Sequence, residues 1–220
     1  MTRSKTILDK MGTTFANALR FNIASTAIRT FTETLQEGYD YAVRLDRTLQ
    51  DIRVVTNKTS EEMANFGAIA NKQAQNLGTR TLDYARSALL FYQQGLGDAE
   101  VKARTDTTAK VAALTRSQNA KVGKELTAMW NAYKVGPEDT EKAVDKLAAV
   151  ANSSAVSLDE LAIAMSKVSS VANSVGIPID KLISQISTIA EQTQAAPEAI
   201  GTSLKTIYSR IGDLKVSGQD

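Results

Sequence analysis

Three pairs of adjacent acidic residues are the side chains best placed for acid–base chemistry in this sequence: Glu61-Glu62, Glu138-Asp139 and Asp159-Glu160. Two neighbouring carboxylates can divide the roles of proton donor and proton acceptor. Each pair, however, lies at the expected start of a helix, where the helix dipole stabilises negative side chains. The second acid of the first and third pairs also stands three residues after a hydroxyl residue, Thr59 or Ser157, which is the spacing of a capping box. We therefore predict that these acids cap helices, and we assign no catalytic residue.

The residue types that are missing restrict the chemistry further. The 220-residue sequence has no histidine and no cysteine, which excludes zinc fingers, disulfide frameworks, thiol nucleophiles and Ser-His-Asp triads from this chain. The 26 basic and 24 acidic side chains leave a formal net charge of +2, too small for a protein that holds polyanions through many phosphate contacts. We expect no enzyme activity, no cofactor, no metal site and no small-molecule substrate. An enzyme that uses carboxylates alone is the least favoured alternative.

Two other segments resemble nucleotide-binding or nucleic-acid-binding motifs only superficially. Gly95-Leu96-Gly97 lacks the spacing and the Lys-Ser/Thr pair of a phosphate loop, so it indicates the end of a helix, and Asp98 is predicted to cap the next one. No aromatic residue for base stacking lies between Tyr92 and Trp130. We predict no specific nucleic-acid partner, a core position for Trp130, and solvated helix faces for the basic residues of this segment, which are Lys102, Arg104, Lys110, Arg116, Lys121 and Lys124.

The elements that carry these side chains are expected to be helices, and the fold class all-α. From residue 21, alternating steps of three and four residues meet apolar side chains at nine of ten positions, which are Phe21, Ala24, Ile28, Phe31, Leu35, Gly38, Ala42, Leu45, Leu49 and Ile52. A 3.5-residue repeat of this length predicts a long helix with a coiled-coil seam. The repeat does not distinguish a partner helix in this chain from one in another copy. As a hypothesis, the self-association seam consists of Phe21, Ile28, Phe31, Leu35, Leu45, Leu49 and Ile52.

Beyond residue 58 the pattern changes to shorter amphipathic segments with start and stop signals. All three prolines fall at expected helix starts, and SLDEL at 157–161 recurs as PIDKL at 178–182, which suggests stacked antiparallel helix pairs. Charge differs between residues 1–135, with a net +6, and residues 136–220, with a net −4. We predict a long amphipathic, coiled-coil helix over 1–57, an array of short, antiparallel, capped helices over 58–215 with a seam near 136, and a tail at 216–220 that we interpret as truncated.

No stretch of the sequence is apolar enough to cross a bilayer. The longest apolar runs are far below 18 residues, and the first 14 residues lack the apolar region of a secretory signal. We therefore expect a cytosolic product, or one that is assembled in the cytosol.

The ordered series of capped helices resembles a known family. Residues 146–211, KLAAVANSSAVSLDELAIAMSKVSSVANSVGIPIDKLISQISTIAEQTQAAPEAIGTSLKTIYSRI, resemble the core region of tail tape measure proteins from long-tailed bacteriophages and related prophages. ARSALLFYQQGLGDAEV at 85–101 and LDRTLQDIRVVTNKTSEEM at 45–63 resemble upstream parts of the same core. Members of that family are usually much longer, so this chain resembles a fragment or a short form.

The resemblance implies a structural protein of the virion. Such a protein is made in the host bacterial cytoplasm, lies in the lumen of the tail tube, determines tail length during assembly and is released at DNA ejection. The implied partners are further copies of the chain, the tail tube protein, tail assembly chaperones and tail tip proteins. The alternative is a helical protein–protein interaction module of a bacterial cytosolic or secreted system.

Overall fold

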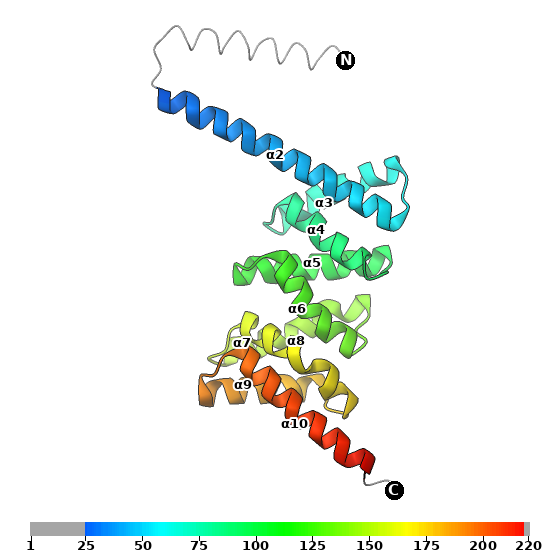
Figure 1. Ribbon diagram of the computed structural model, residues 1–220, viewed down its shortest axis with the longest axis vertical. Coiled ribbons are helices and arrows are strands. Elements are labelled where there is room, and N and C mark those ends of the chain that lie inside the picture. Colours follow the sequence, from blue (N-terminus) through cyan, green and yellow to red (C-terminus); the bar gives the residue numbers. More distant parts are fainter. Residues whose placement is uncertain (1–24, 218–220) are drawn as a thin grey trace. The chain divides into compact units, whose positions relative to one another are not determined.

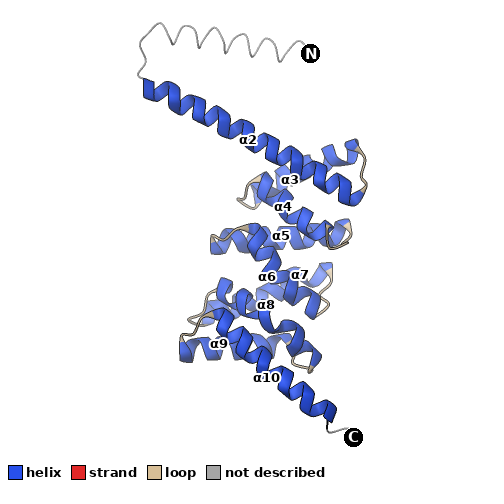
Figure 2. Cartoon of the chain, viewed as in Figure 1, coloured by secondary structure: helices blue, strands red, loops and turns tan. Residues whose placement is uncertain are grey.

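The computed structural model describes the backbone of residues 25–217 and the side chains of residues 35–214. Within this part of the chain, the regular structure is helical and no strand occurs, as Figure 2 shows, so the all-α prediction is confirmed. The α-helices are α2 (Ser25–Thr56), α3 (Ser60–Asn76), α4 (Thr81–Tyr92), α5 (Asp98–Thr115), α6 (Asn119–Ala132), α7 (Thr140–Ser153), α8 (Leu158–Ser174), α9 (Ile179–Thr193) and α10 (Pro197–Ser217), and a 3-10 helix, η1, covers Pro137–Asp139.

Helix α2 carries most of the predicted seam. It has 32 residues and contains the boundary between two compact units, Met1–Asp46 and Arg47–Asp220. The long helix predicted from the apolar repeat is therefore present over Ser25–Thr56. Asn57, with a φ of 54°, ends it in the left-handed region, and Thr59 then caps α3.

In the second unit, helices α3 to α6 are stacked in chain order, whereas α7, α9 and α10 lie around α8 (Figure 1). Neighbouring helices pack in succession from α3 to α6, and α6 then packs against α8. Helix α8 packs against α7, α9 and α10 as well. Residues on both sides of Gly136 therefore share one packed unit.

Helix α8 has a largely apolar interior. Its buried residues are Leu161, Ala162, Ala164, Met165, Val168, Ser169 and Ala172. The buried face is wide because α6 and α10 both cover this helix. Burial of a leucine, methionine or valine side chain such as those of Leu161, Met165 and Val168 stabilises a fold by roughly 1.5–3 kcal/mol.

The contact between α8 and α10 is unusually close at Gly201. A Cβ atom on this buried residue would lie 2.5 Å from the backbone oxygen of Ala164 and 2.9 Å from Cβ of Lys167. Only a residue without a side chain fits there, so glycine sets the distance between these two helices.

Helix α5, in contrast, buries as many polar as apolar residues. Arg104, Thr105, Thr107 and Thr108 are each at most 4% exposed. The helix packs against α4, α6, α7 and η1. The prediction of a solvated face is therefore wrong for Arg104.

The helix starts agree with most of the sequence signals. Pro137 begins η1 and Pro197 begins α10, while Pro178 is the N-cap of α9. Ser157, the N-cap of α8, lies 21 positions before Pro178, so the two members of the internal repeat occupy the same structural position. The predicted cap at Asp98 is wrong, because Gly97 is the N-cap of α5 and Asp98 is its first residue.

Candidate interaction surfaces

The paired acids at the starts of α3 and α8 are engaged in structural contacts. Thr59 and Glu62 form a capping box, and the backbone N–H of Thr59 donates to Glu62 Oε2 over 2.7 Å. The pKa of Glu62 is lowered mainly by this hydrogen bond and, to a smaller extent, by the hydrogen bond from the Thr59 hydroxyl. Ser157 and Glu160 form an equivalent capping box. The capping predictions are confirmed at both positions.

The acids beside these caps have other roles. Asp159 accepts hydrogen bonds from the Ser117 hydroxyl at 3.1 Å and from Lys121 at 3.3 Å. Asp139 accepts one from Lys142 at 2.7 Å. Both aspartates therefore take part in contacts between helices or within a helix start. Asp139 is the N-cap of α7 but its side chain makes no capping hydrogen bond, so the capping prediction is wrong at this position.

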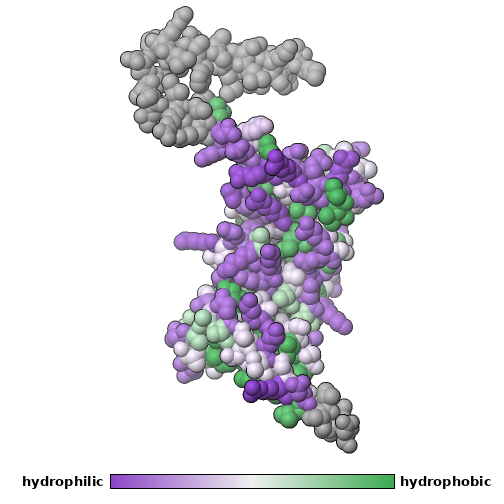
Figure 3. Space-filling view, in the orientation of Figure 1, coloured by the Kyte–Doolittle hydropathy of each residue, from purple (hydrophilic) through white to green (hydrophobic). Residues whose placement is uncertain are grey.

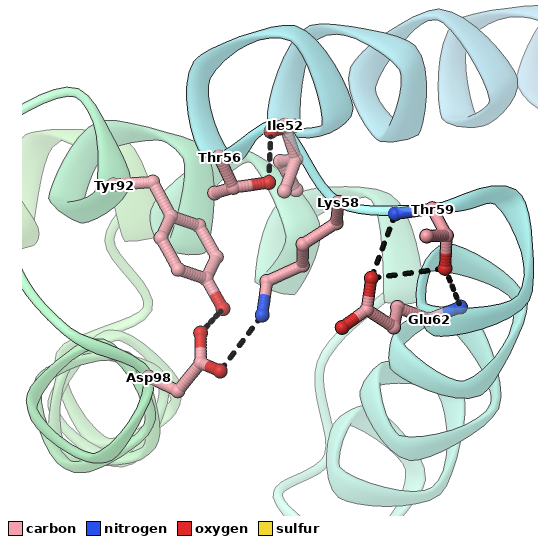
Figure 4. A network of polar contacts seen from close by, with 7 residues as sticks. All are labelled: Ile52, Thr56, Lys58, Thr59, Glu62, Tyr92 and Asp98. Atoms are coloured by element: carbon pink, nitrogen blue, oxygen red, sulfur yellow. Dashed lines mark hydrogen bonds and ion pairs between the residues drawn. The ribbon is translucent and has the colours of Figure 1, made fainter.

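Two polar networks of the same composition connect α4 to α5. In the first, drawn in Figure 4, the Tyr92 hydroxyl donates to Asp98 Oδ1 at 2.8 Å and Lys58 donates to Asp98 Oδ2 at 2.7 Å. In the second, Tyr84 donates to Asp106 Oδ1 at 2.7 Å and Lys102 donates to Asp106 Oδ2 at 2.6 Å. The tyrosines and the aspartates are each eight residues apart, so the two networks repeat after about two helical turns.

The electrostatics of the first network follow from its contacts. The hydrogen bonds from Lys58 and then from Tyr92 lower the pKa of Asp98. The pKa of Tyr92 is raised above its ordinary value mainly by burial and, to a smaller extent, by the hydrogen bond to Asp98. The Lys58 ammonium also lies 5.9 Å from the centroid of the Tyr92 ring, and the lysine belongs to the turn between α2 and α3. The network therefore ties this turn to the start of α5. Sequence reasoning missed it, although the equal spacing of the two Tyr and two Asp residues is a usable signal.

The seven residues of the proposed seam have different environments. Phe21 lies outside the described residues, and Ile28 and Phe31 lie on α2 in the part where only the backbone is described. Leu35 is 47% exposed, whereas Leu45 and Leu49 are half-buried. Ile52 is fully buried. The last seam residue is therefore part of the core of this chain, and Leu35 is the one whose described side chain is available to a partner.

The basic residues of α5 and α6 are distributed between solvent and interior. Lys102, Lys110, Arg116, Lys121 and Lys124 are exposed, as predicted. Arg104 is buried: it pairs with Glu100 at 2.7 Å, donates to Asn131 Oδ1 at 2.9 Å and lies 5.3 Å from the centroid of the Trp130 ring. Burial lowers the pKa of this guanidinium despite the nearby glutamate. Trp130 itself is fully buried, as predicted, with its ring centroid 6.1 Å from that of Phe91.

The surface of the described residues is mostly hydrophilic on the face drawn in Figure 3, with apolar side chains in separate patches. No cluster of acidic residues suited to a metal ion occurs among them. None of their helices is long and apolar enough to be a candidate membrane span. The large apolar side chains that remain exposed are Leu35, Tyr39, Val54, Val55, Ile69, Leu114, Ile207, Ile211 and Leu214.

Comparison with known proteins gives one match. The family model for phage-related minor tail proteins matches residues 71–219, which is more than half of the chain. The chain belongs to this family. No curated protein and no solved structure matches it.

Membership in the phage-related minor tail protein family fits the surfaces described above. A phage-related minor tail protein is a structural component of the virion's tail, and its partners are other components of that tail.

Proposed function

We propose that this chain is the core of a tail tape measure protein. It lies in the lumen of the tail tube, determines tail length during assembly and leaves the tail at DNA ejection. It acts without catalysis, through helix packing. Family membership supports a role in the tail, and the resemblance of residues 40–215 to the tape measure core supports this more specific role.

The observation that carries the proposal is helix α2. Its 32 residues correspond to a length of about 48 Å at 1.5 Å per residue. Leu35 on its seam is 47% exposed in the single chain. A protein that measures distance by the length of its helices needs helices that associate side by side, and a heptad seam provides such association.

The proposal assigns different tasks to the two parts of the chain. Residues 1–57 provide the self-association helix, and residues 58–215 provide the helical core, with 216–220 leading out of it. The proposed partners are further copies of this chain, the tail tube protein, tail assembly chaperones and tail tip proteins. The alternative, an interaction module of a bacterial cytosolic or secreted system, has less support because the matching family is a phage family.

Changing the length of α2 in the parent phage tests tape measurement. Two extra tandem copies of residues 29–42 add 28 residues in phase with the seam, and should lengthen the tail by about 42 Å if the added segment is helical. Deletion of residues 29–42 should shorten it by about 21 Å. Tail lengths are measured by electron microscopy. Tails of unaltered length in both phages would refute measurement by this segment.

Substitution at Leu35 tests the seam separately. Leu35→Glu places a charge in the seam and should weaken self-association of the purified chain, measured by sedimentation equilibrium. Val54→Glu is the matched control, because Val54 is 81% exposed on the same helix but is not a seam residue. Equal association of the two variants would contradict a role for the seam.

A further inference from the structure

A cleft of about 500 Å³ lies in the second unit, where the loop between α3 and α4 meets the loop between α5 and α6. The two loops are tied together by Asn119, which donates a hydrogen bond to the Thr79 hydroxyl at 3.3 Å. The lining residues come from both loops and from the helices that follow or precede them. They are Gly78, Thr79, Arg80, Asp83, Arg86, Ala112, Ala113, Arg116, Ser117, Gln118, Asn119 and Ala120.

Positive charge dominates this lining. Three arginines contribute to it, and the one acidic residue, Asp83, is paired with Arg80 at 2.7 Å. Within the described residues, Arg86 and Arg116 have no acidic partner at ion-pair distance, and both are exposed. Two guanidinium groups at one cleft are therefore available for an anion.

The first turn of α6 adds to this positive potential. Its N-cap, Gln118, makes no side-chain capping hydrogen bond, and the turn contains no acidic residue. Helices α3 and α8, by contrast, have a capping box and acidic residues at the same place. The first amides of α6, at Asn119 and Ala120, belong to residues that line the cleft. Uncapped amides at a helix start favour a negative group.

We infer that this arginine cleft, defined by Arg80, Arg86 and Arg116, binds an acidic segment of another tail polypeptide. A guanidinium group pairs with a carboxylate through two parallel hydrogen bonds, and so it suits aspartate and glutamate side chains. The cleft has room for a few side chains. The inference depends on membership in the tail protein family and not on tape measurement.

Nucleic acid fits the cleft less well than an acidic peptide. No aromatic residue lines the cleft, so bases have no stacking platform. The net charge of the chain is only +2, and a duplex is held by many phosphate contacts spread along a basic surface. The two available guanidinium groups of one cleft match a short acidic segment better.

The conformation at Arg116 allows a clean test. Its φ of 55° lies in the left-handed region, which glycine adopts more readily, so Arg116→Gly removes the charge without opposing the end of α5. Lys134 offers a matched control: it is an exposed basic residue at φ 51°, it follows α6, and it is not in the cleft. Lys134→Gly removes the same charge at the same kind of backbone position.

The experiment uses the full chain and a fluorescein-labelled decapeptide of alternating glutamate and serine, with binding measured by fluorescence anisotropy at low salt. We expect Arg86→Gln and Arg116→Gly each to weaken binding about threefold or more, and the double variant at least about tenfold, since each removes a charge-assisted contact. Lys134→Gly should change the Kd less than twofold. If circular dichroism shows that Arg116→Gly does not fold, the comparison of peptide affinity between Arg86→Gln and Lys134→Gly tests the inference.

Three results would overturn the inference. The first is the absence of measurable binding of the peptide to the native chain. The second is an equal loss of affinity in the cleft variants and in Lys134→Gly, which would indicate a general charge effect. The third is unchanged peptide binding in the cleft variants together with weaker binding of a 20-base-pair DNA duplex, which would assign the cleft to nucleic acid. None of these results bears on tail length, so tape measurement is tested independently.

Discussion

The helix pair α5–α6 and the helix group α8–α10 belong to the same packed unit but are stabilised differently. The interior of α8 consists of apolar side chains such as Leu161, Met165 and Val168, all fully buried. The interior of α5 contains Arg104 and a set of threonines. In the described part of the chain, the buried side-chain nitrogen and oxygen atoms that lack a hydrogen-bond partner all belong to α5 and α6, and are Arg104 Nε, Thr105 Oγ1, Thr108 Oγ1, Glu125 Oε2 and Trp130 Nε1.

This difference has an energetic consequence. A buried polar atom without a partner costs about 1–3 kcal/mol, whereas buried apolar groups are stabilising. Burial also raises the pKa of Glu125, which reflects the cost of holding its charge in the interior. We therefore expect the layer formed by α5 and α6 to be less stable than the packing around α8.

Adding a methyl group where α8 meets α10 should have the largest effect. Gly201→Ala places Cβ 2.5 Å from the backbone oxygen of Ala164, so one helix must move. We expect destabilisation by about 1–3 kcal/mol, measured by urea unfolding.

Gly67→Ala is the control for this substitution. Its Cβ would meet only Leu49 Cδ1, at an ordinary contact distance of 3.6 Å, in the interior of α3. Alanine should stabilise that position by up to about 1 kcal/mol. If both variants changed stability by the same amount, the close approach at Gly201 would not limit the packing of α8.

Two buried threonines provide the next test, because replacing them by valine should change the stability of the protein in opposite directions. Thr105 and Thr140 are both fully buried, but Thr105 Oγ1 has no partner while Thr140 Oγ1 donates to the Gly136 carbonyl oxygen at 3.0 Å. Thr105→Val removes an unsatisfied hydroxyl and should stabilise the protein by about 1 kcal/mol. Thr140→Val removes a hydrogen bond and should destabilise it by about 1 kcal/mol. Stability is measured by thermal unfolding. If both substitutions destabilised the protein, the buried hydroxyl of Thr105 would not be destabilising in the native chain.

The smallest effect is expected from the pH dependence of the Lys58–Asp98–Tyr92 network. The pKa of Asp98 is lowered in the folded state. The ionised Asp98 side chain therefore contributes to the free energy of unfolding above its unfolded pKa of about 4, and this contribution is lost as the pH falls toward the folded pKa. Because the Asp98 side chain is 67% exposed, solvent screening should keep this contribution below about 1 kcal/mol. Between pH 5 and pH 3, the native chain should lose more stability than Asp98→Asn in urea titrations.

Asp145→Asn serves as the comparison for this pH test, because Asp145 is an exposed acid on α7. If Asp98→Asn lost as much stability between pH 5 and pH 3 as the native chain, the pH dependence would belong to other groups.

The sequence predicted the features that depend on neighbouring residues. The capping boxes at Thr59 and Ser157 and the proline starts involve residues within one turn, so local spacing suffices to find them. The helical class follows from the apolar period. Trp130 was also placed correctly, because a large aromatic residue among apolar neighbours has few positions outside the core.

The features that sequence reasoning missed depend on helix pairing. Arg104 resembles its solvated neighbours in the sequence, and it is buried only because Glu100, Asn131 and Trp130 surround it in the fold. The arginine cleft brings Arg80 and Arg86 to Arg116, which lies about 30 residues further along the chain. The width of the buried face of α8 likewise requires knowledge of two neighbouring helices.

The burial of Trp130 provides a built-in optical probe. It is the single tryptophan of the chain, and it lies between Arg104 and Phe91, in the layer where the unsatisfied polar atoms are found. Its fluorescence emission therefore reports the opening of the surroundings of Trp130, while circular dichroism reports all helices together. A red shift of the emission at lower denaturant concentration than the loss of ellipticity would show that this layer separates first.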